Sequence, residues 1–164
     1  MPQLFDDLIR ALAQEIKQEL TVEENRIAFE IDGLVYDMKY QADGETVFMY
    51  AYIAEIPTQD SIIQRATVLA ALYQQLLQSQ YFFCKTAGFT FGVDEDANFI
   101  ILQSLLPVES IREQAFVEAV EKFVQTTNVW HGLLEKLIVK YQEGHMPEIE
   151  VPSLGGDASG FIRV

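Results

Sequence analysis

The chain has few of the residues that mark secreted, membrane or nucleic-acid-binding proteins. Its 164 residues contain one cysteine, Cys84, which cannot form an intramolecular disulfide. Eleven basic residues stand against twenty-five acidic ones, a net charge of −14 that repels nucleic acids and anionic membranes. No apolar run has the length of a membrane span, and the N-terminus lacks the regions of a signal peptide. We therefore expect no nucleic-acid partner, no membrane insertion and a cytoplasmic location.

The motifs of catalytic and metal sites are also missing. The sequence has no GxGxxG, P-loop or GxSxG, and His131 and His145 stand on different elements without metal-ligand spacing. Asp94, Asp96 and Asn98 open like a calcium loop, but Phe99 and Leu105 occupy the positions that require Gly and Glu, so a solvated turn is expected. Cys84 has no nearby histidine, and a lone cysteine is more often a small buried residue than a nucleophile. We predict no enzyme activity, no metal and no cofactor.

Alternating apolar and polar residues predict a run of three strands. Ile27 to Ile31 and Leu34 to Tyr40 flank Asp32-Gly33, a dipeptide that tolerates the positive φ angles of a type I′ turn and so predicts a hairpin. Asp43-Gly44 precedes a third strand from Glu45 to Ile53, which is apolar on both faces. Such a strand belongs inside a sheet, or has one face on helices and the other on a ligand or partner.

Three segments have helical periodicity. The first runs from about Pro2 to Leu20, and the second from Asp60 to Gln78, with Thr58 or Asp60 as its expected N-cap. The second is poor in charge, which suggests a subunit contact. The third begins at Ser110-Ile-Arg-Glu113, interpreted as a capping box, and extends to about Tyr141.

Two more strands and a tail complete the pattern. Gly88 to Val93 and Asn98 to Leu106 predict a strand pair around the turn at Asp94 to Ala97. Beyond Gly144, glycines and prolines without periodicity predict a flexible tail. The expected organisation is one domain over residues 1–143 and a tail over 144–164, with an α+β fold in the order α-β-β-β-α-β-β-α.

This order, with several residue strings, resembles the class I chaperones of type III secretion, the CesT/SycE-like or Tir chaperone family. The segments that carry the resemblance are Phe29-Glu-Ile-Asp-Gly33, Val47 to Pro57, the helix from Ile62 to Leu77, Gly88-Phe-Thr-Phe-Gly-Val-Asp94, Ile101-Leu-Gln-Ser-Leu-Leu-Pro107, and the final helix with Phe116, Phe123 and Trp130. The resemblance covers about Leu4 to Tyr141. It implies a twisted antiparallel five-stranded sheet flanked by helices, in a homodimer of the bacterial cytoplasm.

The resemblance also implies a function and a site. Members of this family bind an N-terminal segment of a secreted effector and keep it extended and secretion-competent without ATP, with the secretion ATPase or sorting platform as a possible further partner. Binding would use the edge strand Arg26 to Ile31 and apolar side chains beside it. The expected effector contacts are Phe5, Leu8, Ile9, Leu12, Ile27, Phe29, Leu34, Tyr36, Phe48 and Tyr50, with ordinary core packing as the alternative for each. The expected dimer contacts are Ala66, Ala70, Tyr73, Phe89 and Phe91.

Two other classes stay open at this point. A regulatory adaptor of similar fold, such as a YbjN-like protein, would fit the same pattern without a secreted partner. A hot-dog thioesterase would need a positioned carboxylate, histidine or glutamine in an acyl pocket, and no residue pattern marks one.

Overall fold

One antiparallel sheet organises the chain in the computed structural model, which describes residues 2–58, 61–83, 85–109 and 111–145. The elements follow the predicted order: α1 (Pro2–Ile16), β1 (Arg26–Ile31), β2 (Leu34–Gln41), β3 (Thr46–Glu55), α2 (Ile62–Gln80), β4 (Thr90–Asp94), β5 (Phe99–Pro107) and α3 (Glu113–Gln142). Short 3-10 turns cover Ala42–Gly44 and Tyr81–Phe83. Cys84 and residues 146–164, with the tail expected there, lie outside the described residues.

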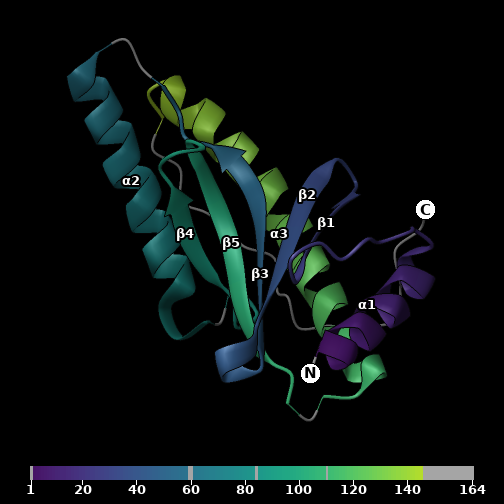
Figure 1. The fold of residues 1–164 in the computed structure, drawn as a ribbon. Helices are drawn as coiled ribbons and strands as arrows, with labels where there is room; N and C mark the ends of the chain where they lie inside the picture. The colour runs from purple at the N-terminus through teal and green to yellow at the C-terminus, as the bar shows by residue number, and fades with distance from the viewer. Residues whose placement is uncertain (1, 59–60, 84, 110, 146–164) are drawn as a thin grey trace.

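The strands lie in the order β1-β2-β3-β5-β4, so β1 and β4 are the two edges (Figure 1). The predicted first hairpin is confirmed: Asp32 and Gly33 have φ angles of 52° and 80°, and Ile31 pairs with Leu34. The apolar β3 lies inside the sheet, as its sequence predicts, with β2 and β5 as neighbours.

Within the part of the chain that the structure describes, helices cover one face of the sheet. In Figure 1, α3 crosses behind the strands with α1 beside it, and α2 lies alongside β4. The covered face carries Met38, Val47, Met49 and Leu102, all at most 1% exposed, which pack with Phe116 and Phe123 of α3. Burial of this apolar surface is the main stabilising contribution to the fold. The opposite face, which we call the open face, has no helix over it among the described residues.

The helix ends differ from those predicted. Helix α1 ends at Ile16 rather than Leu20, because Lys17 takes a left-handed φ of 54° and the Gln18 N–H donates to the Ala13 carbonyl at 3.2 Å, a Schellman-type turn. The N-cap of α2 is Ser61, whose hydroxyl accepts from the Gln64 N–H. The capping box is wrong, because α3 begins at Glu113 with Arg112 as its N-cap; Ser110 itself is not among the described residues.

A β-bulge interrupts the pairing of β3 with β5. The register shifts between Tyr52 and Ala54, so Ile53 has no partner in the ladder. The Ile53 carbonyl instead lies 2.8 Å from Nδ1 of His131 on α3. This contact ties the end of β3 to the middle of the long helix.

Candidate binding edge and open sheet face

The free edge of β1 offers backbone groups to an added strand. In a two-residue hairpin the residues flanking the turn form a hydrogen-bonded pair, and such pairs then alternate along the strands. Ile27, Phe29 and Ile31 therefore bond to β2, and the N–H and C=O groups of Arg26, Ala28 and Glu30 point away from the sheet. An extended peptide that docks here would pair with this outward row.

Two contacts from the α1–β1 connection occupy part of that row. Arg26 exchanges backbone bonds with Glu23 at 2.8 and 2.9 Å, and the Gln18 side-chain amide donates to the Glu30 carbonyl at 3.0 Å. The Ala28 N–H, the Ala28 C=O and the Glu30 N–H have no hydrogen-bond partner among the described residues. The open part of the edge is thus three backbone groups centred on Ala28.

A polar groove runs beside these groups. It measures about 570 Å³ and is lined by Thr21, Glu23, Glu24, Arg26, Ile27, Ala28 and Lys39. Glu23 and Glu24 are exposed and make no ion pair within the described part of the chain. Arg26 and Lys39 also line the groove, so it carries two carboxylates and two cations.

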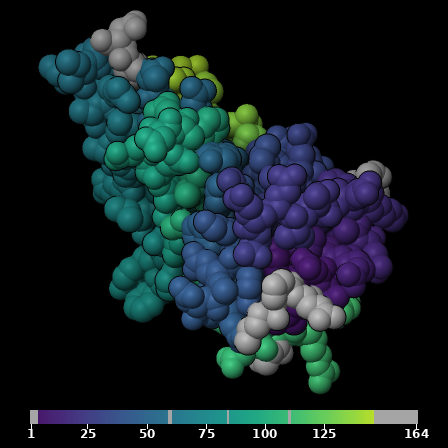
Figure 2. All heavy atoms as spheres, viewed as in Figure 1, coloured from purple at the N-terminus to yellow at the C-terminus, as the bar shows by residue number. Residues whose placement is uncertain are grey.

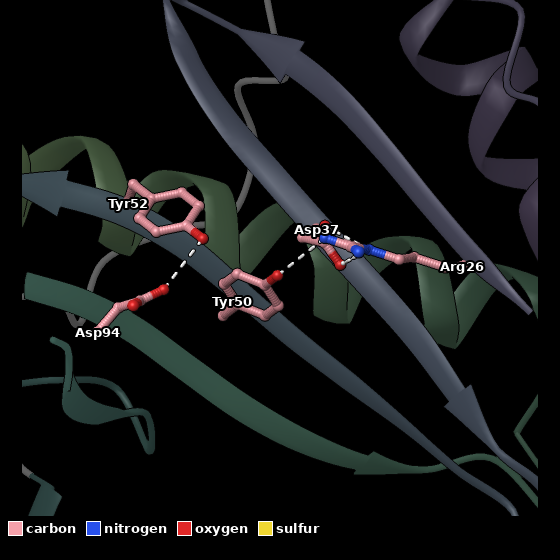
Figure 3. Close-up of polar contacts among 5 residues, drawn as sticks. All are labelled: Arg26, Asp37, Tyr50, Tyr52 and Asp94. Atoms are coloured by element: carbon pink, nitrogen blue, oxygen red, sulfur yellow. Dashed lines mark hydrogen bonds and ion pairs between the residues drawn. The ribbon is translucent and has the colours of Figure 1, made fainter. Parts of the chain in front are cut away.

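A polar network on the open face fixes the start of β1 (Figure 3). The Arg26 guanidinium donates to both carboxylate oxygens of Asp37, with Nε at 2.9 and 2.8 Å, and Nη2 also donates to the Tyr50 hydroxyl at 3.1 Å. These bonds and the Asp37 charge raise the pKa of the Arg26 guanidinium above its ordinary value. Burial, with the Asp37 charge adding to it, raises the pKa of the Tyr50 hydroxyl to about 12. Tyr50 therefore stays neutral at physiological pH.

Aromatic rings continue from this network across the open face. Phe48, Tyr50, Tyr52 and Phe99 form a row of touching rings, with successive centroids 5.6, 5.7 and 5.4 Å apart. The Tyr52 hydroxyl donates to Asp94 at 3.2 Å. All four rings are only partly buried, and Leu105 on the same face is 58% exposed. Figure 2 gives the same view with all atoms, and strand residues form the middle of this surface. An uncovered face of this composition is typical of a surface that meets a partner.

The ten expected contact residues divide between the core and the open face. Phe48 and Tyr50 lie on the open face. The other eight are at most 7% exposed and pack in the core, namely Phe5, Leu8, Ile9, Leu12, Ile27, Phe29, Leu34 and Tyr36. Core packing, the alternative named for each, is the role that this structure gives them. Their contact with a partner stays a prediction.

The five expected dimer residues divide in a similar way. Ala66 and Ala70 are exposed on α2 and Tyr73 is partly buried. Phe89 and Phe91 face α3 instead, with ring centroids 5.0 Å from Phe123 and 4.8 Å from Trp130. Exposed apolar side chains that the sequence reasoning did not select extend the α2 surface, namely Ile62, Ile63, Leu77 and Tyr81, at 86, 79, 67 and 71%.

The described residues contain neither a metal-binding group of side chains nor a helix that could span a membrane. No group of three or more His, Cys, Asp or Glu side chains within them could hold a metal ion. None of the described helices is long and apolar enough to cross a bilayer.

The sequence did not predict the contacts of Gln18, Glu23, Arg26 and Asp37. The hairpin register, which sets Ala28 opposite Asp37, could have indicated the diagonal Arg26–Asp37 pair.

Comparison with known proteins finds one matching family and several solved structures of similar fold. A family model described as the Tir chaperone protein (CesT) family matches residues 7–131. A solved structure described as the ExsC–ExsE complex contains a chain with a TM-score of 0.62 and 17% identity, over 79% of this chain and 95% of that one. The ExoU–SpcU complex of the Pseudomonas aeruginosa type III secretion system gives 0.54 and 16%, over 78% and 94%. The HopA1–SchA chaperone–effector complex gives 0.54 and 14%, over 79% and 94%. No curated protein sequence matches. At these identities the structural likeness concerns the fold.

Proposed function

The chain belongs to the Tir chaperone protein (CesT) family, and from this we propose that it is an ATP-independent chaperone of type III secretion. It binds the N-terminal chaperone-binding segment of one or more secreted effectors and keeps that segment extended. Its action is binding without catalysis, in the bacterial cytoplasm, and the secretion ATPase or sorting platform receives the complex. The solved complexes of similar fold, one of them described as chaperone–effector, support this proposal.

The observation that carries the proposal is the partly open edge of β1. A strand that lies antiparallel beside β1 would exchange two hydrogen bonds with Ala28 and accept a third from the Glu30 N–H. Backbone pairing of this kind holds a segment extended with little dependence on its sequence, and side chains then add specificity.

The charge-poor surface of α2 supports a homodimer. Ile62, Ile63, Leu77 and Tyr81 are exposed there together with Ala66 and Ala70. A soluble monomer seldom leaves so many large apolar side chains in one stripe. Two copies related by a two-fold axis would cover both stripes at once.

The test begins with a tagged chain in the source cell. Proteins that co-purify with it are identified by mass spectrometry, and the segment of any secreted protein among them is mapped. Ala28→Pro then removes the central outward N–H, and Pro is tolerated on an edge strand because no ladder bond is lost. We expect this variant to lose most binding, while Ala28→Val, which keeps the N–H, binds as the wild type does.

The possible failures separate the parts of the proposal. If no secreted protein is retained, the chaperone function is wrong. If a secreted segment binds and Ala28→Pro leaves its affinity unchanged, the function holds and the docking edge is wrong. Circular dichroism and light scattering establish that each variant is folded and keeps the wild-type assembly state.

A further inference from the structure

The open face has its own charge pattern, separate from the β1 edge. At the end of β4, Asp94, Glu95 and Asp96 stand around an apolar floor that includes Phe48, Tyr50 and Ile101, in a hollow of about 530 Å³. Asp94 is held by Tyr52 and by the Ala97 N–H at 2.9 Å. Glu95 and Asp96 are exposed and make no ion pair in the described part of the chain. These two carboxylates are available to a cation from outside.

The cations of the open face do not neutralise the carboxylates of Glu95 and Asp96. Arg26 is engaged by Asp37. Lys39 lies on β2, opposite Phe48 in the ladder with β3. Strands β2 and β4 are three strand spacings apart, about 14 Å. At that distance across a solvated surface most of the attraction is screened.

The aromatic rings of the open face are held in place before any ligand binds. Hydrogen bonds from Arg26 and to Asp94 hold the Tyr50 and Tyr52 rings, and ring contacts hold Phe48 and Phe99 beside them. Gly92 leaves room for Ile101, since a Cβ at Gly92 would lie 3.0 Å from the Ile101 side chain. Fixed rings cost less ordering entropy on binding than mobile ones, and aromatic faces attract cations.

We propose that the open face binds a second segment of the effector, in which an arginine or lysine is flanked by apolar side chains. The cation lies between Glu95 and Asp96, and the apolar side chains lie on Phe48, Tyr50 and Leu105. This inference rests on the proposed function and adds a separate site with a stated ligand chemistry. A second copy is a poor occupant, because two faces with this acidic end, on chains of net charge −14, repel each other.

The test uses three blocked peptides and the full-length chain with Ala28→Pro, which removes the central outward N–H of the β1 edge. The probes are (Leu-Arg)4, (Leu-Glu)4 and (Ser-Arg)4, titrated into the nitrogen-15-labelled protein and followed by amide chemical shifts. We expect (Leu-Arg)4 to bind, with shifts gathered at residues 48–52 and 92–105. The other two probes should bind at least about tenfold more weakly, because each lacks one half of the recognition.

Matched variants separate the site from general charge attraction. Glu95→Gln with Asp96→Asn should weaken (Leu-Arg)4 about tenfold. Glu19→Gln with Glu109→Gln removes the same charge from exposed positions elsewhere and should change the affinity less than about twofold. Phe48→Leu, which keeps an apolar side chain and removes the ring, should weaken binding about fivefold.

Four results of the peptide titrations would overturn the inference. They are equal binding of (Leu-Glu)4, equal binding of (Ser-Arg)4, an equal loss in the two charge-removed variants, and shifts confined to residues outside the open face. Dissociation of a wild-type dimer by the Glu95 and Asp96 changes would also overturn it, because a second copy would then cover the face. None of these results bears on effector capture at the β1 edge, so failure here is distinguishable from failure of the proposed function.

Discussion

At the scale of single residues, Asp37 is the side chain whose burial most needs its partner. Its side chain is 6% exposed on a face that is otherwise open, whereas that of Arg26 is 56% exposed. Without Asp37, β1 would lose its only ion pair to β2 among the described residues. The Arg26 guanidinium would also lose the partner that orients it toward the Tyr50 hydroxyl. The pair is therefore expected to matter more than an ordinary surface contact.

Replacement of Asp37 tests this. We expect Asp37→Ala to lower the free energy of unfolding by about 1 to 2 kcal/mol, a value reduced for the exposure of Arg26. Asp7→Ala removes the exposed ion pair between Asp7 and Arg10 and should cost less than about 0.5 kcal/mol. Urea denaturation of both variants at one protein concentration makes the comparison, and equal losses would contradict the special role of Asp37.

Glu121 should make stability depend on pH. Burial, and then the charges of Glu15 and Glu118, raise its pKa from 4.5 to about 7. The folded chain thus holds this proton more tightly than the unfolded chain does. The contribution is fully present below about pH 4.5 and is lost as the pH rises through about 7.

The measurement is urea denaturation at pH 5 and pH 8. Glu121→Gln should remove the part of the pH dependence that comes from this group, and should stabilise the protein at pH 8 by on the order of 1 kcal/mol after allowance for solvent screening. Glu19→Gln, at an exposed position, serves as the control. An unchanged pH profile in Glu121→Gln would contradict the assignment.

At the scale of elements, the turn that ends α1 controls the β1 edge. The left-handed Lys17 directs the chain so that the Gln18 amide reaches the Glu30 carbonyl, which would otherwise be open beside the three free groups. A docking strand must displace this amide before it can form a fourth bond. Gln18 therefore competes with any ligand of the edge.

Removal of the competing amide should strengthen binding. Gln18→Ala is expected to raise the affinity for the mapped effector segment roughly threefold to tenfold, the value of one net hydrogen bond. Gln14→Ala changes an exposed α1 glutamine whose side chain makes no hydrogen bond within the described residues, and should have no effect. Titration calorimetry decides the matter, and an unchanged or weaker affinity in Gln18→Ala would show that Gln18 does not guard the edge.

The elements also show what sequence can and cannot predict here. Asp32-Gly33 determines both the hairpin and its register, because only a two-residue turn with positive φ angles fits. The apolar stripes of α1 and β1 fit either core packing or a contact surface. Hydrophobic periodicity identifies the apolar face of an element, but it does not identify what packs against that face. The predicted start of a helix was wrong where several residues that can act as an N-cap stand close together, as Thr58, Asp60 and Ser61 do before α2. The Gln18–Glu30 contact joins residues whose proximity depends on the tertiary turn, so no local pattern predicts it.

At the scale of the whole molecule, the apolar surface and the acidity work together. Net charge of −14 keeps chains apart in solution, and the charge-poor α2 stripe is where that repulsion is weakest. In the dimer proposed above, association would thus be directed to this surface. The open face, with its acidic end, would then remain accessible to the basic segment proposed above.

A charge placed in the α2 stripe should separate the subunits. We expect Ala70→Glu to weaken a dimer by at least about tenfold, because a carboxylate without a partner would be buried in the contact. Gln125→Glu adds the same charge on the exposed side of α3 and should leave the assembly unchanged. Light scattering at micromolar concentration gives the result. A monomeric wild type would contradict the dimer itself.

The bulge in β3 has a spectroscopic consequence. Because the Ile53 carbonyl can only accept, Nδ1 of His131 must carry a proton, and in the neutral ring Nε2 is left without one. This is the less common tautomer of neutral histidine in water, and the two ring nitrogens should give well-separated nitrogen-15 resonances rather than the averaged pair of a free side chain. His145, which lies beyond the end of α3 and is exposed with Nδ1 3.8 Å from Glu143, gives a comparison within the same molecule. His131 is thereby a built-in reporter, whose tautomer should stay fixed for as long as the sheet stays packed on α3.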